Sequence, residues 1–131
     1  MTDDNLSTKK LKLEQAWDLI QVGRFQASQR VLKSMQPEDQ DSEGYHTMWL
    51  STLIFAEEWP EVETYARKLV EQHGAFYLSA WHALIDGLCG QGKYAEAKAI
   101  LDRAMANWPL DEILQAMDKN VATLASFDRR S

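Results

Sequence analysis

The sequence predicts an all-α fold, built as a solenoid of helix-turn-helix repeats, and three observations point to it. One turn motif (glycine, base, aromatic) occurs at residues 23–25 and again at residues 92–94. The aromatic residues Phe25, Trp59 and Tyr94 are spaced by 34 and then 35 residues, and the middle turn keeps its aromatic without a glycine. Apolar residues recur at helical spacing on both sides of each turn. This period and pattern are typical of a helix-turn-helix solenoid, whose stacked repeats leave a concave binding surface.

The first helix pair begins after a loose segment, residues 1–7, with Ser7 or Thr8 as its N-cap. Its first helix has apolar residues at helical spacing, namely Leu11, Leu13, Ala16, Leu19 and Ile20. Gly23 ends this helix, as a left-handed C-terminal glycine does. The second helix then covers about residues 25–35.

A polar loop, residues 36–43, leads to the second pair, whose first helix opens near Ser42. Residues 48–55 are apolar over most of the helix circumference, so this helix is buried on several sides or binds something. Pro60 suits the first turn of the next helix, which continues to Gly74.

The third pair is the most regular of the three. Its first helix covers residues 78–88, Gly90 and Gly92 form the turn, and its second helix covers residues 94–105. Asp111 then caps a seventh helix. The apolar residues expected on one face of that helix are Ile113, Leu114, Met117, Val121 and Leu124. Its polar opposite face suits the end of a solenoid.

The composition indicates one acidic globular domain. The 131 residues are 45% hydrophobic and 26% charged, and the net charge is −6 from 14 basic and 20 acidic residues. Acids flank the only dense basic run, residues 9–12, which argues against nucleic acid as a partner. Cys89 is the single cysteine, so no internal disulfide forms. An acidic, polar start and no apolar stretch of bilayer length predict a cytoplasmic protein without membrane insertion.

Eight residues of the third pair stand at the spacings of a known helical repeat: Trp81, Leu84, Gly92, Tyr94, Ala97, Leu101, Ala104 and Pro109. They resemble the tetratricopeptide repeat (TPR), although Ile85 stands where that family favours a small residue. The first pair matches at Ala16, Leu19, Gly23, Phe25, Leu32 and Met35, with Ser28 where alanine is common. The middle pair keeps only the apolar pattern, at Trp49, Leu53, Trp59, Val62, Ala66 and Leu69.

This resemblance implies a right-handed α-solenoid of three TPR-like helix pairs plus a C-terminal capping helix. The expected bounds are about residues 9–42, 43–77 and 78–111 for the pairs and 111–126 for the capping helix. Together they form a single domain over residues 8–127, followed by a loose tail over residues 128–131.

In a TPR solenoid, the first helix of each pair lines the concave groove. The resemblance therefore places a partner-binding groove at Leu13, Trp17, Ile20, Thr47, Ser51, Ile54, Phe55, Ser79, His82, Asp86 and Cys89. One end is apolar and aromatic, which suits an amphipathic helix or a hydrophobic peptide. The alternative is that Trp17, Ile54 and Phe55 pack against neighbouring helices. The carboxylate clamp of some TPR domains is not matched, because its places hold Leu13, Trp17, Ser79 and Ala83.

The function that the resemblance implies is a non-enzymatic protein-protein interaction module, a chaperone or an adaptor. Small three-repeat TPR proteins include the chaperones of bacterial type III secretion, which hold aggregation-prone helical subunits before export. The short length, the acidic balance and the apolar groove are similar to those proteins. The alternative is a structural subunit that self-associates, as a homodimer, through residues 47–56.

The residues His82, Asp86 and Cys89 share one helix face and suggest a nucleophile with a base and an acid. However, His82 and Cys89 stand about 10 Å apart along a helix axis, whereas direct proton transfer needs about 3 Å. We therefore expect a polar groove floor, with a local hydrogen bond between His82 and Asp86, and no catalysis. No four ligands stand at metal-binding spacing, and the glycines after Asp86 follow a helix, so no metal or other cofactor is expected.

Overall fold

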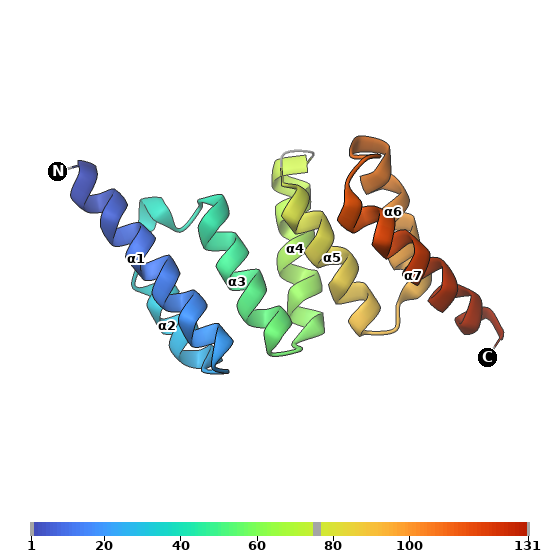
Figure 1. Ribbon diagram of the computed structural model, residues 1–131, viewed down its shortest axis with the longest axis horizontal. Helices are drawn as coiled ribbons and strands as arrows, with labels where there is room; N and C mark the ends of the chain where they lie inside the picture. The colour runs from blue at the N-terminus through green and yellow to red at the C-terminus, as the bar shows by residue number, and fades with distance from the viewer. Residues whose placement is uncertain (1, 75–76, 131) are drawn as a thin grey trace. The chain divides into compact units, whose positions relative to one another are not determined.

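The computed structural model describes the backbone of residues 2–74 and 77–130 and the side chains of residues 8–74 and 77–126. Every regular element within those residues is a helix, which confirms the all-α prediction. The helices are α1 (Thr2–Gln21), α2 (Phe25–Lys33), α3 (Glu43–Phe55), α4 (Trp59–His73), α5 (Leu78–Gly90), α6 (Tyr94–Asn107) and α7 (Glu112–Arg130), as drawn in Figure 1. A short 3-10 helix, Pro37–Asp39, lies within the predicted loop.

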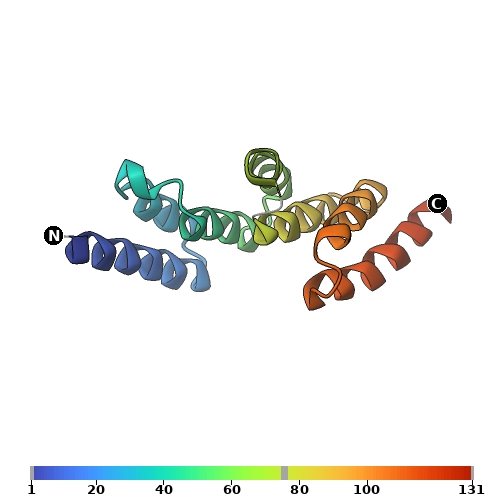
Figure 2. The same ribbon diagram turned by 90° about the horizontal axis from the view of Figure 1, so that it is seen from above.

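The chain divides into two compact units, unit 1 ending at Glu57 and unit 2 beginning at Glu58. In unit 1, the helices α1, α2 and α3 all contact one another. In unit 2, α4 packs on α5, α5 on α6, and α6 on α7. Figure 2 shows α1 beside α2 in unit 1 and α6 beside α7 in unit 2. The boundary falls inside the predicted middle pair, so α3 belongs to unit 1 and α4 to unit 2.

The three predicted turns share one backbone conformation. Gly23 and Gly92 have φ angles of 79° and 77°, and Glu57, at the matching place, has φ 57°. The residue after each of them has φ between −93° and −86° and ψ between 60° and 70°. The helices α2, α4 and α6 then begin at the three predicted aromatic residues. The middle turn therefore keeps the left-handed conformation although it has no glycine.

We expect Glu57→Gly to stabilise the protein by about 0.5–1 kcal/mol. A left-handed residue with a Cβ costs about 1–2 kcal/mol, and the entropy that glycine adds to the unfolded chain offsets part of the gain. The matched control is Glu58→Gly, because Glu58 has φ −86° and gains nothing from glycine. Urea unfolding followed by circular dichroism measures both. Equal destabilisation by the two variants would contradict the strain at Glu57.

The core of unit 1 forms where its three helices meet. It contains the buried side chains of Ala16, Leu32, Met35 and Tyr45. Ser28 on α2 and Thr52 on α3 are fully buried as well, with their hydroxyl oxygens 3.1 Å apart. The Thr52 hydroxyl donates to the carbonyl of Met48 at 2.8 Å, so the Ser28 hydroxyl donates to Thr52. This buried pair is satisfied and joins α2 to α3.

In unit 2, two glycines of α5 let it approach α4 closely. An added Cβ at Gly87 would lie 2.9 Å from the backbone nitrogen of Glu63. At Gly90 an added Cβ would overlap the indole ring of Trp59. The prediction that Gly90 belongs to the turn is wrong, because it is the last residue of α5 and its small size serves this packing.

The helix ends differ from the predictions in two places. Helix α1 extends back to Thr2, beyond the expected cap at Ser7 or Thr8. Helix α7 extends to Arg130, into the expected tail. The side chains of residues 1–7 and 127–131 lie outside the described part of the chain, so the looseness of both ends stays a prediction.

The apolar face of α7 is narrower than predicted. Leu114 and Val121 are buried, but Ile113 is 53% exposed and Leu124 is 37% exposed. The reason is that α7 packs almost entirely on α6, and a single neighbour covers only a narrow strip of a helix. The predicted cap is confirmed, because the backbone N–H of Leu114 donates to Asp111 Oδ2 at 2.9 Å.

Candidate functional site

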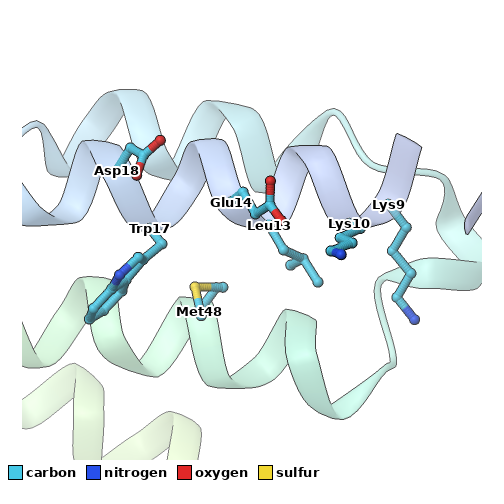
Figure 3. Close-up of a pocket in the computed structure, with 7 residues that line it drawn as sticks. All are labelled: Lys9, Lys10, Leu13, Glu14, Trp17, Asp18 and Met48. Atoms are coloured by element: carbon cyan, nitrogen blue, oxygen red, sulfur yellow. The ribbon is translucent and has the colours of Figure 1, made fainter. Parts of the chain in front are cut away.

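A pocket of about 730 Å³ opens on unit 1 between α1 and α3. We call it the α1–α3 pocket. Its lining residues are Lys9, Lys10, Leu13, Glu14, Trp17, Asp18 and Met48, and Figure 3 shows them. All but Met48 come from α1. Leu13 and Trp17, two predicted groove residues, are thus brought together in one concave surface.

The spacing of the residues along α1 produces this surface. Lys10, Leu13 and Trp17 follow one another at three- and four-residue intervals, so they lie on one side of the helix. Gly44 at the start of α3 allows α1 to come close, because an added Cβ there would lie 3.1 Å from Leu13 Cδ1. A side chain at Gly44 would therefore push Leu13 into the pocket.

An aromatic pair stands where α1 and α3 meet beyond Met48. The rings of Trp17 and Phe55 pack edge to face, with centroids 5.8 Å apart and planes at 84°. Phe55 remains 52% exposed and Trp17 is half-buried. This pair combines a large apolar area with a fixed geometry, the properties of an anchor point for a partner.

The charged residues of the pocket separate by sign. In Figure 3, Lys9 and Lys10 point to the side on which Leu13, Trp17 and Met48 lie. Glu14 and Asp18 line the pocket too; in Figure 3 the Asp18 carboxylate points away from α3, whereas the Glu14 carboxylate lies beside Leu13. The pocket therefore has Lys9 and Lys10 at one end, and the aromatic ring of Trp17 together with the acid Asp18 at the other.

The other predicted groove residues of unit 1 lie elsewhere. Ile20 is only 1% exposed and belongs to the core, so it has no surface to offer a partner. Thr47, Ser51 and Ile54 are half-buried on α3 and Phe55 is exposed at its end, and the described lining of the pocket includes none of these four. Met48 lines it instead. Met48 and Phe55 are two helical turns apart and so lie on one side of α3, but this helix is apolar over most of its circumference and its sequence alone does not single out Met48.

The remaining predicted residues, Ser79, His82, Asp86 and Cys89, lie half-buried on α5 in unit 2. The expected hydrogen bond between His82 and Asp86 is wrong. His82 Nε2 instead donates to Asp111 Oδ2 at 2.9 Å, because Asp111 already stands at the start of α7 as its cap. The hydrogen bond from the Leu114 N–H and, next, the contact with His82 hold the pKa of Asp111 below its usual value.

The ionisable groups of α5 differ from an activated nucleophile. Burial raises the pKa of the Cys89 thiol, and the nearby Asp86 carboxylate raises it further. Burial also raises the pKa of Asp86. A thiol with a raised pKa stays protonated at neutral pH and is a weak nucleophile. The His82–Asp111 contact acts as a bridge between α5 and α7.

The described residues include neither a cluster of metal ligands nor a helix that could span a membrane. Among them, no group of three or more His, Cys, Asp or Glu side chains lies close enough together to hold a metal ion. No described helix combines the length and apolarity needed to cross a bilayer.

The comparisons with known proteins give no match. The chain matches no family model, and no curated protein and no solved structure matches it. The candidate site therefore depends on the geometry above and on the resemblance in the sequence.

Proposed function

We propose that this protein is a non-enzymatic interaction module that binds an apolar or amphipathic helical segment of another protein in the α1–α3 pocket. The observation that carries the proposal is an aromatic pair: Trp17 lines the pocket, and Phe55, which is 52% exposed, packs against it just outside the lining. A large exposed aromatic next to a pocket is typical of an interface anchor. Burying the free half of Phe55 would contribute about 1–1.5 kcal/mol.

The wider proposal is a right-handed α-solenoid of TPR-like pairs that acts in the cytoplasm as a small chaperone or adaptor, similar to the chaperones of type III secretion. It is supported by the repeated turn conformation at Gly23, Glu57 and Gly92. The α1–α2 and α5–α6 packing supports it too. The absence of enzymatic activity is part of the proposal, which rests on the raised pKa of the Cys89 thiol and the engagement of His82 by Asp111.

We expect Phe55→Ala to weaken partner binding about tenfold, or ~1.4 kcal/mol, while the free energy of unfolding changes less. The reason is that half of Phe55 is exposed in the free protein, so its loss removes more contact from the complex than from the fold. Pull-down from the native lysate with wild type would identify the partner, and titration of the purified partner would then measure the affinity of each variant.

The matched control for that experiment is Leu11→Ala. Leu11 lies on the same helix as Trp17 and is 55% exposed, but it neither lines the pocket nor packs in the Trp17–Phe55 pair. The Leu11→Ala variant should bind the partner as tightly as wild type does. Equal losses of affinity and stability in Phe55→Ala, or equal affinity losses in both variants, would contradict the proposed binding surface.

Self-association is the second candidate function, and exposed apolar residues favour it. Besides Phe55 on α3, Leu110 is 86% exposed and Ile113 lies exposed next to it at the start of α7. Light scattering over a range of concentrations separates the two functions. A dimeric mass that Phe55→Ala abolishes would assign this surface to a second copy of the chain.

A further inference from the structure

The two lysines of the α1–α3 pocket differ from the third lysine of the same basic run. Lys12 Nζ donates to the carbonyl of Ser34 at 2.8 Å and so ties α1 to the end of α2. Within the described residues, neither Lys9 nor Lys10 forms an ion pair or a side-chain hydrogen bond. Lys10 and Glu14 are four residues apart and both line the pocket, but no ion pair joins these two described side chains. The fold uses Lys12 and, as far as the described side chains go, leaves the other two ammonium groups without a partner beside the pocket.

The distance between the two ends of the pocket sets a spacing for whatever binds there. Lys10 and Trp17 are seven residues apart on α1, or about 10 Å along the axis. Leu13 and Met48 provide an apolar surface between them. An occupant that lies along α1 therefore meets positive charge at one end and aromatic surface about two helical turns away.

From this arrangement, we infer that the occupant is an amphipathic helix with acidic residues about two turns away from its main apolar anchor. Its apolar anchor packs on Trp17 and Phe55, and its carboxylates pair with Lys9 and Lys10. The inference rests on the proposed function and adds the charge and register of the partner. The local positive charge of Lys9 and Lys10 is what favours carboxylates at this place, because the net charge of the chain, −6, repels acidic partners at long range.

The test uses two fluorescein-labelled helical peptides of about four turns with identical apolar anchors. One carries a pair of glutamates about two turns from the anchor, and the other carries lysines at the same places. We expect wild type to bind the glutamate peptide about tenfold more tightly at low salt, and this preference to shrink in about 0.5 M salt because exposed charges are then screened. The double variant Lys9→Glu/Lys10→Glu should reverse the preference.

A matched control has the same change of net charge at other exposed positions. The double variant Lys68→Glu/Lys119→Glu makes this charge change on α4 and α7, at residues that do not line the pocket. This control should keep the wild-type preference, and thermal melts should show that both double variants are folded.

The remaining outcomes separate this inference from the proposed function. If wild type binds both peptides equally and Phe55→Ala abolishes the binding of both peptides, the proposed function stands and the inference is overturned. A preference for glutamate that survives Lys9→Glu/Lys10→Glu also overturns the inference. Binding of neither peptide overturns both statements. A wild-type dimer that Phe55→Ala dissociates assigns the pocket to a second copy and overturns the inference.

Discussion

Replacing Gly87 with alanine should destabilise the protein by about 1–3 kcal/mol, although alanine is the better helix former. An added Cβ would lie 2.9 Å from the backbone nitrogen and 3.2 Å from the Cα of Glu63. Backbone atoms of a packed helix cannot rotate away, so α4 and α5 must separate along their contact. Such overpacking costs about 1–3 kcal/mol, and more where backbone is the obstacle, so it outweighs the ~1 kcal/mol that alanine contributes to the helix.

Gly90→Ala should also destabilise unit 2, but through a side chain, and double variants separate the two causes. The Cβ at Gly90 would overlap the indole of Trp59, whereas Gly87 faces mainly backbone. Trp59→Leu should therefore recover part of the loss in Gly90→Ala. Val62→Ala should recover little of the stability lost in Gly87→Ala, although Val62 Cγ1 is 3.1 Å from the added Cβ.

Urea unfolding followed by circular dichroism gives the free energies for these cycles. The control is Gly92→Ala, where an added Cβ meets nothing within 4 Å but φ is 77°. It should cost only the left-handed strain, about 1–2 kcal/mol, and show no coupling to Trp59. A Gly87→Ala variant as stable as wild type would contradict the close approach of α4 and α5.

The repeated turn was predictable because it depends on local chemistry. A left-handed residue followed by an aromatic at a helix start requires few neighbours, and the pattern predicted all three helix starts, including the one after Glu57. The buried partner of Ser28 was not predictable in the same way. The resemblance marks Ser28 as a departure from alanine, but only the packing of α2 on α3 places the Thr52 hydroxyl beside it.

The pocket was predictable in part, and the reason lies in the two helices that form it. For helix α1, the register of the resemblance predicted Leu13 and Trp17 as groove residues, and both line the pocket. Helix α3 is apolar over most of its circumference, so periodicity cannot say which of its faces is free. A rotation of one residue, about 100°, separates the predicted Thr47 from the observed Met48.

The carboxylate of Glu63 should make the stability of unit 2 depend on pH in the acidic range. Glu63 Oε1 accepts hydrogen bonds from Gln91 Nε2 at 2.7 Å and from Lys93 Nζ at 3.0 Å, and Oε2 accepts one from Arg67 Nη2 at 3.1 Å. Burial alone would raise the pKa of Glu63, but the hydrogen bonds from Lys93, Gln91 and Arg67 outweigh it and lower the pKa. The folded state therefore favours the charged carboxylate more than the unfolded chain does.

The sign of the effect follows from that lowered pKa. The stabilisation from Glu63 is present above its ordinary pKa of 4.5 and is lost as the pH falls through the lower pKa of the folded protein. Glu63→Gln should cost about 2 kcal/mol at pH 7, because it replaces hydrogen bonds to a charged acceptor with weaker ones and turns an amide N–H toward Arg67. The difference between wild type and this variant should shrink toward pH 3.

Glu96→Gln is the matched control, because Glu96 also contacts Arg67. That contact is 3.9 Å long and Glu96 is largely exposed, so its loss should change stability little. Unfolding free energies of wild type, Glu63→Gln and Glu96→Gln from pH 7 to pH 3 test this prediction. An effect of Glu63→Gln that does not change with pH would contradict the lowered pKa of Glu63.

Gln91 connects this prediction with the one for Gly87, because it also donates to the carbonyl of Gly87 at 3.0 Å. If α5 moves off α4 in Gly87→Ala, Glu63 loses Gln91 and its pKa should rise toward the ordinary value.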